Sequence, residues 1–219
     1  SSDVCSSDLE LLSSADSLEN GCLVDAVTEG GKYLGTGLLS QNSKIRIRIL
    51  SQNANDRYDE AFWQRRVEYA WSYRKTVMGE DRSCCRIIFG EADGFPGLTV
   101  DRFSDLLVVQ CLSFGMEQRK QMLYPLLREC LERDGVTLRG IYERNDNPLR
   151  EKEGLSQGKG WFEENGLQVH GDPVSEISEN GIRYLVDVEN GQKTGYFLDQ
   201  KYNRQAVARL SKGRRVLDC

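Results

Sequence analysis

The stretch GQKTGYFLDQKYNR, which ends at Arg204, gathers chemically capable side chains at the predicted start of a helix. Tyr196 and Phe197 offer a flat apolar wall. The polar side chains that follow are Asp199, Gln200 and Arg204. Backbone N–H groups at a helix start favour anionic or polar ligands. The pattern predicts a ligand-binding segment, although an ordinary capped helix behind a packed Tyr-Phe pair would have the same sequence.

The stretch KIRIRIL alternates basic and apolar residues, as a strand with one buried face would. Its basic face consists of Lys44, Arg46 and Arg48. A solvated charged face is the simpler interpretation, and a face that contacts phosphate groups is the alternative. Residues 44–86 hold ten Lys/Arg against six acids, so the chain is locally basic although its net charge is −5.

Composition and motif content exclude several classes of site. The single histidine, His170, rules out a multi-histidine metal site, and the seven cysteines include no CxxC pair. The sequence contains no P-loop, and no apolar run approaches the roughly 20 residues of a membrane span. We therefore expect no metal, no membrane partner and a cytoplasmic protein with reduced thiols.

Three short strands are predicted within residues 22–50, followed by one helix over residues 57–78. Asn55 or Asp56 is expected to cap this helix, because short polar side chains accept hydrogen bonds from its first N–H groups. The helical spacing of the apolar residues predicts a buried face made of Trp63, Val67, Ala70 and Trp71.

Residues 86–145 predict the order strand, strand, strand, helix, strand, which is typical of a compact α+β module. The first two strands flank the turn GEADGFPG. Pro125 falls inside the predicted helix, so we expect a kink or a later helix start. Residues 148–165 are polar and rich in glycine, and they are predicted to form a loop.

The last fifty residues are expected to contain short strands and then a helix. The stretch GLQVHG predicts one strand, and the Asn180-Gly181 pair predicts a tight hairpin between two others. The helix is expected to be capped by Asp199 and to end at Gly213. Its inward side chains are expected to be Ala206, Val207 and Leu210. A strand that begins at Arg215 would open an α/β nucleotide-type fold.

Three stretches together resemble the bacterial class I S-adenosylmethionine-dependent rRNA methyltransferases that make 5-methylcytosine in large-subunit rRNA. They are GEADGFPGLTVDRF, GQKTGYFLDQKYNR and the terminal VLDC. The resemblance implies an α+β fold with an incomplete α/β part. It divides the chain into a partial PUA β-barrel (10–52), a linker helix with a small α+β middle domain (53–165) and the start of a Rossmann-like methyltransferase domain (166–219).

The resemblance also implies a cofactor, S-adenosylmethionine, and a partner, 23S rRNA. The implied edge of the cofactor pocket consists of Tyr196, Phe197, Asp199, Gln200 and Arg204, with Asp218 beneath it. Phe197 and Gln200 are the expected direct contacts. Asp199 is expected to act as the helix cap, and Arg204 to form a structural ion pair. The implied RNA contacts are Lys44, Arg46 and Arg48.

No catalytic residue is assigned, since the family's nucleophilic cysteine and Gly-rich cofactor turn lie beyond the VLDC stretch. The chain is therefore expected to be an internal fragment without activity of its own, preceded by a non-native leader at residues 1–9. Two alternatives remain open. One is a non-catalytic PUA-type RNA-binding protein with a vestigial methyltransferase portion, and the other is a methyltransferase that acts on another RNA base. The sequence does not identify the target nucleotide or the oligomeric state.

Overall fold

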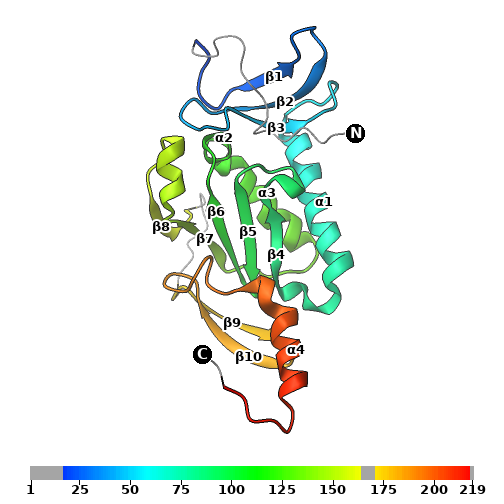
Figure 1. Ribbon diagram of the computed structural model, residues 1–219, viewed down its shortest axis with the longest axis vertical. Helices are drawn as coiled ribbons and strands as arrows, with labels where there is room; N and C mark the ends of the chain where they lie inside the picture. The colour runs from blue at the N-terminus through cyan, green and yellow to red at the C-terminus, as the bar shows by residue number, and fades with distance from the viewer. Residues whose placement is uncertain (1–16, 164–170, 218–219) are drawn as a thin grey trace.

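The computed structural model describes residues 17–163 and 171–217, which form three stacked parts (Figure 1). A three-stranded sheet lies at one end, and a five-stranded sheet with the two longest helices lies in the middle. A β-hairpin and a further helix lie at the other end. The mixture of helices and strands agrees with the sequence prediction. Asp218 and nearly all of the predicted strand GLQVHG lie outside the described residues.

The N-terminal sheet contains β1 (Leu23–Val27), β2 (Tyr33–Leu39) and β3 (Ile47–Ser51), paired antiparallel in that order. The three strands predicted within residues 22–50 are thus confirmed. The predicted alternation of basic and apolar residues along the third strand is wrong, because β3 begins at Ile47 and leaves Lys44 and Arg46 outside it. The backbone N–H of Ser40 bonds the carbonyl of Arg46 at 2.7 Å, which makes the intervening residues the loop of the β2–β3 hairpin.

Helix α1 (Glu60–Met78) joins this sheet to the middle part. Its cap is Asp59, whose carboxylate accepts a hydrogen bond from the Phe62 N–H at 3.0 Å. The predicted cap at Asn55 or Asp56 is wrong, because the Asp56 carboxylate instead accepts from the Ser51 hydroxyl at 2.5 Å in the preceding turn. The predicted buried face is confirmed, with Trp63, Val67, Ala70 and Trp71 all in the main core.

The central sheet has the strand order β4-β5-β6-β7-β8. Neighbouring strands pair antiparallel except β6 and β7, which are parallel and are joined through helix α3. The bounds are β4 (Cys84–Phe89), β5 (Leu98–Phe103), β6 (Leu106–Cys111), β7 (Gly140–Asn145) and β8 (Gly158–Trp161). The order of strands and helix predicted for residues 86–145 is confirmed. The predicted loop that follows is partly wrong, since it contains β8 and the 3-10 helix η4 (Pro148–Glu153).

Two helices, α1 and α3 (Lys120–Arg133), cover one face of the central sheet and enclose the main core. The indole N–H of Trp71 on α1 donates to Asp134 at the end of α3 at 2.6 Å. A short helix α2 (Phe114–Glu117) precedes α3, so the long helix begins only at Lys120. This agrees with the later helix start that was expected from Pro125. Pro125 nevertheless remains inside α3.

The hairpin of β9 (Val174–Glu179) and β10 (Ile182–Asp187) packs against the opposite face of the central sheet. Asn180 and Gly181 both have positive φ, at 53° and 78°, as a tight hairpin turn requires. The predicted hairpin is therefore confirmed. A second core lies between the two sheets and includes Phe103, Ile177 and Val186.

The C-terminal helix differs from the prediction in its packing. The 3-10 turn η5 (Leu198–Gln200) leads into α4 (Lys201–Ser211). Val207 and Leu210, predicted to face inward, are 57% and 78% exposed. Among the described residues no element packs on that side of α4, so the apolar stripe stays open. Residues 215–217 are not in a strand, contrary to the prediction.

The helices of this fold are amphipathic surface helices. The longest, α1, spans 19 residues and carries charged side chains along much of its length. Within residues 17–163 and 171–217, no helix combines the length and apolarity needed to cross a membrane. The same ranges contain no group of three or more His, Cys, Asp or Glu side chains placed to hold a metal ion.

Candidate functional site

A buried carboxylate fixes the predicted ligand segment to the central sheet. The Thr194 hydroxyl donates to Asp101 Oδ2 at 2.6 Å. Arg86 on β4 binds both oxygens of the same carboxylate, at 2.8 and 3.0 Å. Asp101 is fully buried, while the Arg86 side chain is 34% exposed. This three-residue contact joins β4, β5 and the segment before α4 at one point.

A second anchor holds the start of the same segment. The Arg144 guanidinium on β7 donates to the carbonyls of Val188 and Gly191, at 2.7 and 3.0 Å. A Cβ at position 191 would lie 2.3 Å from the Gly195 carbonyl oxygen, so only glycine fits this turn. The backbone that leads to Tyr196 is therefore positioned by side chains of the central sheet.

Arg204 points into the protein rather than toward a ligand. Its guanidinium binds Glu179 at 2.6 and 2.8 Å and donates to the Phe197 carbonyl at 2.9 Å. Its carbon Cζ also lies 4.3 Å from the centre of the Tyr196 ring. Burial, followed by the nearby Glu179 carboxylate, raises the pKa of Tyr196 to about 12. The structural ion pair expected for Arg204 is confirmed, and both side chains position the segment.

Phe197, Asp199 and Gln200 lie nearer the surface. The Lys193 ammonium lies 4.5 Å from the centre of the Phe197 ring and 3.2 Å from the Asp199 carboxylate. The Asp199 carboxylate also accepts from the Gln200 amide at 3.2 Å. Hydrogen bonds from Gln200 and then Lys193 lower the pKa of Asp199. Asp199 is not the helix cap as predicted, because the η5 turn moves the helix start to Lys201.

A groove of about 560 Å³ lies between this segment, the end of α1 and the edge strand β4. Its apolar lining includes Val77, Phe89 and Leu198, and its charged lining includes Arg86 and Lys193. Aromatic and aliphatic groups on the walls suit a planar ligand. The two cations are paired with carboxylates, Arg86 with Asp101 and Lys193 with Asp199. Of the predicted contacts, Asp199 lines the groove, whereas Phe197 and Gln200 are not among its lining residues. The opposite wall was not predicted, because nothing in the sequence of α1 or β4 indicates that they face this segment.

Lys201 also belongs to the site, although it was not among the residues predicted from the sequence. It lines the groove, its side chain is 5% exposed, and its ammonium binds Asp81 at 2.6 Å. Its backbone carbonyl accepts from the Asn180 side chain at the hairpin turn at 3.3 Å. Lys201 therefore ties the start of α4 to both the hairpin and the 3-10 turn η2 (Gly79–Ser83), which follows α1. Long cationic side chains are usually exposed, so only its position in the fold reveals this role.

The described cysteines include buried thiols that are poorly suited to nucleophilic attack. Cys84, Cys85, Cys111 and Cys130 are all buried and free. Burial raises the pKa of Cys84 to about 12 and that of Cys85 to about 11. Because the thiolate is the nucleophile, such thiols are almost entirely unreactive at neutral pH. The raised pKa values thus agree with the expectation that neither Cys84 nor Cys85 is a catalytic residue.

The predicted RNA-contacting residues have three different environments. Lys44 is exposed, and the half-buried Arg46 donates to the Gln41 carbonyl at 3.3 Å. Arg48 binds Glu153 at 2.9 Å and Glu91 at 3.3 Å, and its side chain is 14% exposed. The exposure and the partners of the three cations differ, and Arg48 joins the N-terminal sheet to the middle part. RNA contact by these residues stays a prediction, for which Lys44 is the best placed.

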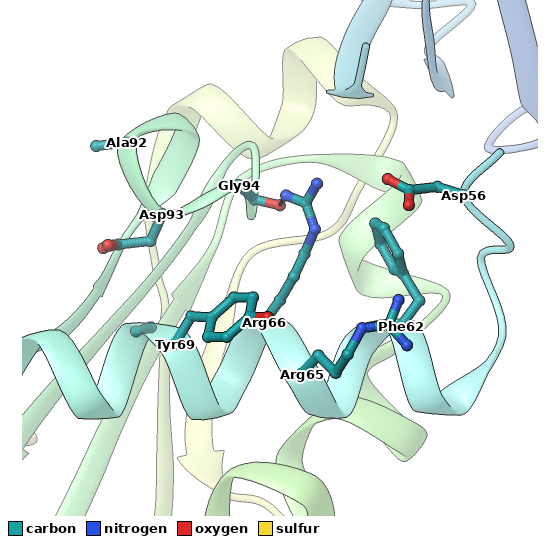
Figure 2. Close-up of a pocket in the computed structure, with 9 residues that line it drawn as sticks. Asp56, Phe62, Arg65, Arg66, Tyr69, Ala92, Asp93 and Gly94 are labelled. Carbon is teal, nitrogen blue, oxygen red and sulfur yellow. Dashed lines mark hydrogen bonds between the residues drawn. The ribbon is translucent and has the colours of Figure 1, made fainter. Parts of the chain in front are cut away.

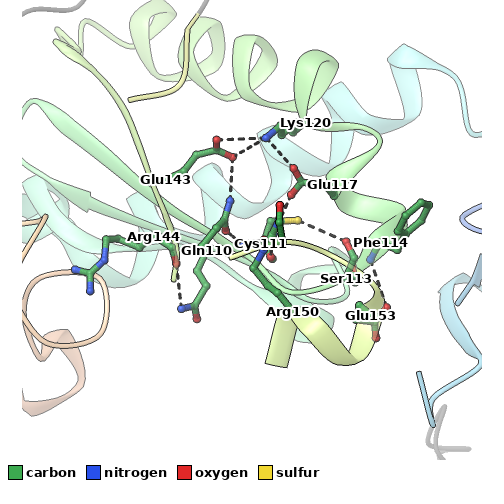
Figure 3. A network of polar contacts seen from close by, with 12 residues as sticks. Gln110, Cys111, Ser113, Phe114, Glu117, Lys120, Glu143, Arg144, Arg150 and Glu153 are labelled. Carbon is green, nitrogen blue, oxygen red and sulfur yellow. Dashed lines mark hydrogen bonds and ion pairs between the residues drawn. The ribbon is translucent and has the colours of Figure 1, made fainter. Parts of the chain in front are cut away.

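A polar network beside α2 is the strongest rival site (Figure 3). Lys120 binds Glu117 at 2.7 Å and Glu143 at 3.2 Å, and Arg150 binds Glu117 at 3.0 Å. Arg150 also donates to the Ser156 carbonyl at 2.7 Å. These charges are paired with one another, and they hold η4 against α2 and α3 against β7. We therefore interpret the network as structural.

Glu153 extends this network to the N-terminal sheet. It is 2% exposed, and it accepts hydrogen bonds from Arg48 and from the Ser40 hydroxyl, the latter at 2.8 Å. Burial alone would raise the pKa of Glu153, but the hydrogen bonds, led by that from Arg48, bring it below its ordinary value of 4.5. The ionised Glu153 carboxylate therefore contributes fully to stability above about pH 4.5. Its contribution falls as the pH drops through the lower pKa of the folded state.

Replacing Glu153 with glutamine is expected to lower the free energy of unfolding by about 1–3 kcal/mol at neutral pH, because Arg48 loses its charged partner. Urea unfolding at neutral pH and at pH values below the folded-state pKa provides the measurement. The difference from the unmodified chain should shrink in acid. Glu151→Gln, on the exposed side of the same 3-10 helix, is the matched control and should have little effect. Equal losses for the two variants would contradict this account of the Arg48 contact.

The fold defined by these elements has counterparts among known proteins. Residues 6–52 match the family model described as a PUA-like domain. A solved structure described as a putative SAM-dependent methyltransferase from Streptococcus mutans aligns with a TM-score of 0.69 at 20% identity, over 87% of this chain and 46% of that chain. A crystal structure described as a putative methyltransferase complexed with SAH gives the same values. At this identity, the likeness shows the fold alone.

Curated proteins with higher identity share one name, ribosomal RNA large subunit methyltransferase I. The protein from Aeromonas hydrophila is 38% identical over 209 residues, which are 91% of this chain and 49% of that protein. The protein from Shewanella denitrificans is 39% identical over 204 residues, which are 91% of this chain and 48% of that protein. The chain therefore spans about half the length of the curated relatives that it matches.

Proposed function

We propose that this chain forms part of an S-adenosylmethionine-dependent methyltransferase that makes 5-methylcytosine in large-subunit rRNA. The observation that carries the proposal is 38% identity over 91% of the chain to a protein named as a large-subunit rRNA methyltransferase. Residues 10–52 would supply a PUA-like RNA-binding part, and residues 53–165 a middle domain. Residues 166–219 would supply the approach to the cofactor domain. The proposed location is the cytoplasm.

Phe197 and Gln200 are the proposed direct contacts to the cofactor. Support comes from their partial exposure on a segment that Thr194, Arg144 and Arg204 anchor firmly. A bound S-adenosylmethionine would supply an electrophilic methyl group, and this segment would offer an aromatic wall and an amide to the ligand. Tyr196 and Arg204 would position that wall, and Asp218 is proposed to lie beneath the cofactor.

Methyl transfer to C5 of cytosine requires a nucleophile that adds to C6, because C5 by itself reacts poorly. A thiolate in that role must lie beside the target base and have a low pKa. The buried thiols of Cys84 and Cys85 have raised pKa values and do not meet this requirement. We therefore assign positioning roles, and no catalytic role, to the described residues.

The proposed cofactor contacts Phe197 and Gln200 can be tested in a chimaera. The chimaera joins this chain to the part of the Aeromonas hydrophila relative outside the aligned region. Titration calorimetry with S-adenosylmethionine should detect binding. Replacing both Phe197 and Gln200 with alanine should weaken that binding by about tenfold, because one stacking surface and one hydrogen bond are lost. Gln205→Ala, on the exposed surface of α4, is the matched control. Unchanged affinity in the double variant would place the cofactor elsewhere.

A further inference from the structure

Helix α1 presents a row of exposed side chains on the face opposite its buried tryptophans. Arg65, Tyr69, Tyr73 and Val77 recur at intervals of four residues, so they lie along one side of the helix. Tyr69 is 70% exposed and Tyr73 is 58% exposed. Phe89, at the end of the edge strand β4, is 56% exposed and lines the same groove as Tyr73. Three large rings in one continuous surface are more than the scattered apolar exposure of an ordinary surface.

A second groove, of about 510 Å³, lies at the end of this row near the N-terminal sheet (Figure 2). Arg65 and Tyr69 line it from α1, while Asp93 and Gly94 line it from the turn after β4. Arg66 crosses to that turn and donates to the Gly94 carbonyl at 3.0 Å. Gly94 has a φ of 76°, a left-handed backbone conformation that favours glycine at this position. The row thus connects two grooves, one near each end of α1.

The linings of the two grooves hold more cations than carboxylates, although the chain as a whole is acidic. The linings of the two grooves contain six cations against three aspartates. The six are Arg65, Arg66, Arg74, Arg86, Lys193 and Lys201. Four of the six bind carboxylates: Arg74 binds Asp93 at 2.6 Å, Lys193 binds Asp199 at 3.2 Å, Arg86 binds Asp101 at 2.8 Å and Lys201 binds Asp81 at 2.6 Å. The other two, Arg65 and Arg66, line the groove near the N-terminal sheet. The excess of cations at that end favours a ligand with negative charge, although the chain as a whole has a net charge of −5.

Cations also lie against the rings of this path. The Arg74 guanidinium is 4.9 Å from the Tyr73 ring centre, and that of Arg86 is 5.1 Å from the Phe89 ring centre. These cations hold one side of each ring, and more than half of the Tyr73 and Phe89 surface stays open to solvent. Exposed rings between cations are the surface on which unpaired bases stack while their phosphates meet positive charge.

We infer that the α1 row binds a single-stranded segment of RNA, with bases stacked on Tyr69, Tyr73 and Phe89. This inference rests on the proposed function, and it adds a path for the RNA from the N-terminal sheet to the groove beside Leu198. Arg65 at one end and Lys193 at the other would contact phosphates. No assignment made from the sequence included Tyr69, Tyr73 or Phe89, because helical spacing separates a buried face from an exposed one without saying what the exposed face meets.

The test is fluorescence anisotropy of the full 219-residue chain with a labelled single-stranded RNA of about 12 nucleotides at low salt, in the absence of S-adenosylmethionine. The double change Tyr69→Ala and Tyr73→Ala should weaken binding by roughly 10- to 100-fold, because two stacking surfaces are lost. Changing both tyrosines to phenylalanine should restore affinity to within about twofold, since the rings alone are needed. Arg65→Gln should lower the slope of log affinity against log salt by about 0.7. Arg183→Gln, at an exposed arginine on β10, should leave both quantities unchanged.

Two results would overturn the inference. One is the absence of RNA binding by the unmodified chain, and the other is unchanged affinity in the double alanine variant. If that variant instead loses self-association in sedimentation while its RNA affinity is unchanged, the row is a protein interface and the inference is wrong. Because the assay contains no cofactor and needs no turnover, it is independent of the methyl-transfer measurement that tests the proposed function.

Discussion

Replacing Asp101 with alanine should lower the free energy of unfolding by about 3 kcal/mol. The reason is that Asp101 is fully buried and holds both Arg86 and Thr194, so its loss leaves a half-buried guanidinium and a hydroxyl unpaired. The partial exposure of Arg86 keeps the loss at the lower end of the range for broken buried pairs. Urea unfolding followed by circular dichroism provides the measurement.

Two further variants separate the parts of this effect. Thr194→Val removes one hydrogen bond and should cost about 1 kcal/mol. Asp105→Asn changes a more exposed carboxylate, whose side chain is 42% exposed beside Arg139, and should cost less than 1 kcal/mol. If the loss in Asp101→Ala is no larger than that in Thr194→Val, the buried carboxylate is not the anchor of the segment before α4.

The 219-residue chain by itself should transfer no methyl group to unmodified large-subunit rRNA. Within the described ranges, Cys84 and Cys85 are buried, and burial raises the pKa of their thiols to about 12 and about 11. At pH 7 such thiols are almost entirely protonated, so they cannot supply the nucleophile that C5 methylation needs. The measurement is incorporation of label from S-adenosylmethionine into rRNA, with the Aeromonas hydrophila relative as the positive control.

A positive result in that assay has a defined interpretation. Turnover that disappears when Cys84, Cys85 or Cys219 is changed to serine would show that one of these thiols is catalytic. Raising the pH toward the pKa of Cys85 would then increase the rate, because the thiolate fraction would rise with pH. Either finding would contradict the positioning role assigned to the described residues.

Local patterns in the sequence predicted the secondary structure well. The buried face of α1 follows from the helical spacing of Trp63, Val67, Ala70 and Trp71, and each of them lies in the main core. The Asn180-Gly181 hairpin follows from turn chemistry, since both residues adopt positive φ. These predictions succeed because they depend on neighbours in the chain.

Several predictions about side chains failed because the sequence does not show their partners. Val207 and Leu210 form the apolar stripe expected of a helix, but the sequence of α4 does not show whether another element covers that stripe. Arg48 looked like part of a basic surface, yet its partner Glu153 lies more than one hundred residues away. The predicted capping role of Asp199 is wrong, because its carboxylate binds Lys193 and the helix starts at Lys201. The candidate site was accordingly predicted on one wall only.

We have proposed that this chain supplies the RNA-binding and cofactor-facing part of an enzyme that methylates cytosine in large-subunit rRNA. The most direct test is mass spectrometry of nucleosides from unmodified large-subunit rRNA treated with S-adenosylmethionine and the chimaera of this chain with the unaligned part of the Aeromonas hydrophila relative. The account predicts new 5-methylcytosine, which should be strongly reduced when Tyr69 and Tyr73 are both changed to alanine. A chimaera that folds and binds the cofactor but leaves cytosine unmethylated, while the relative itself methylates it, would contradict the claim.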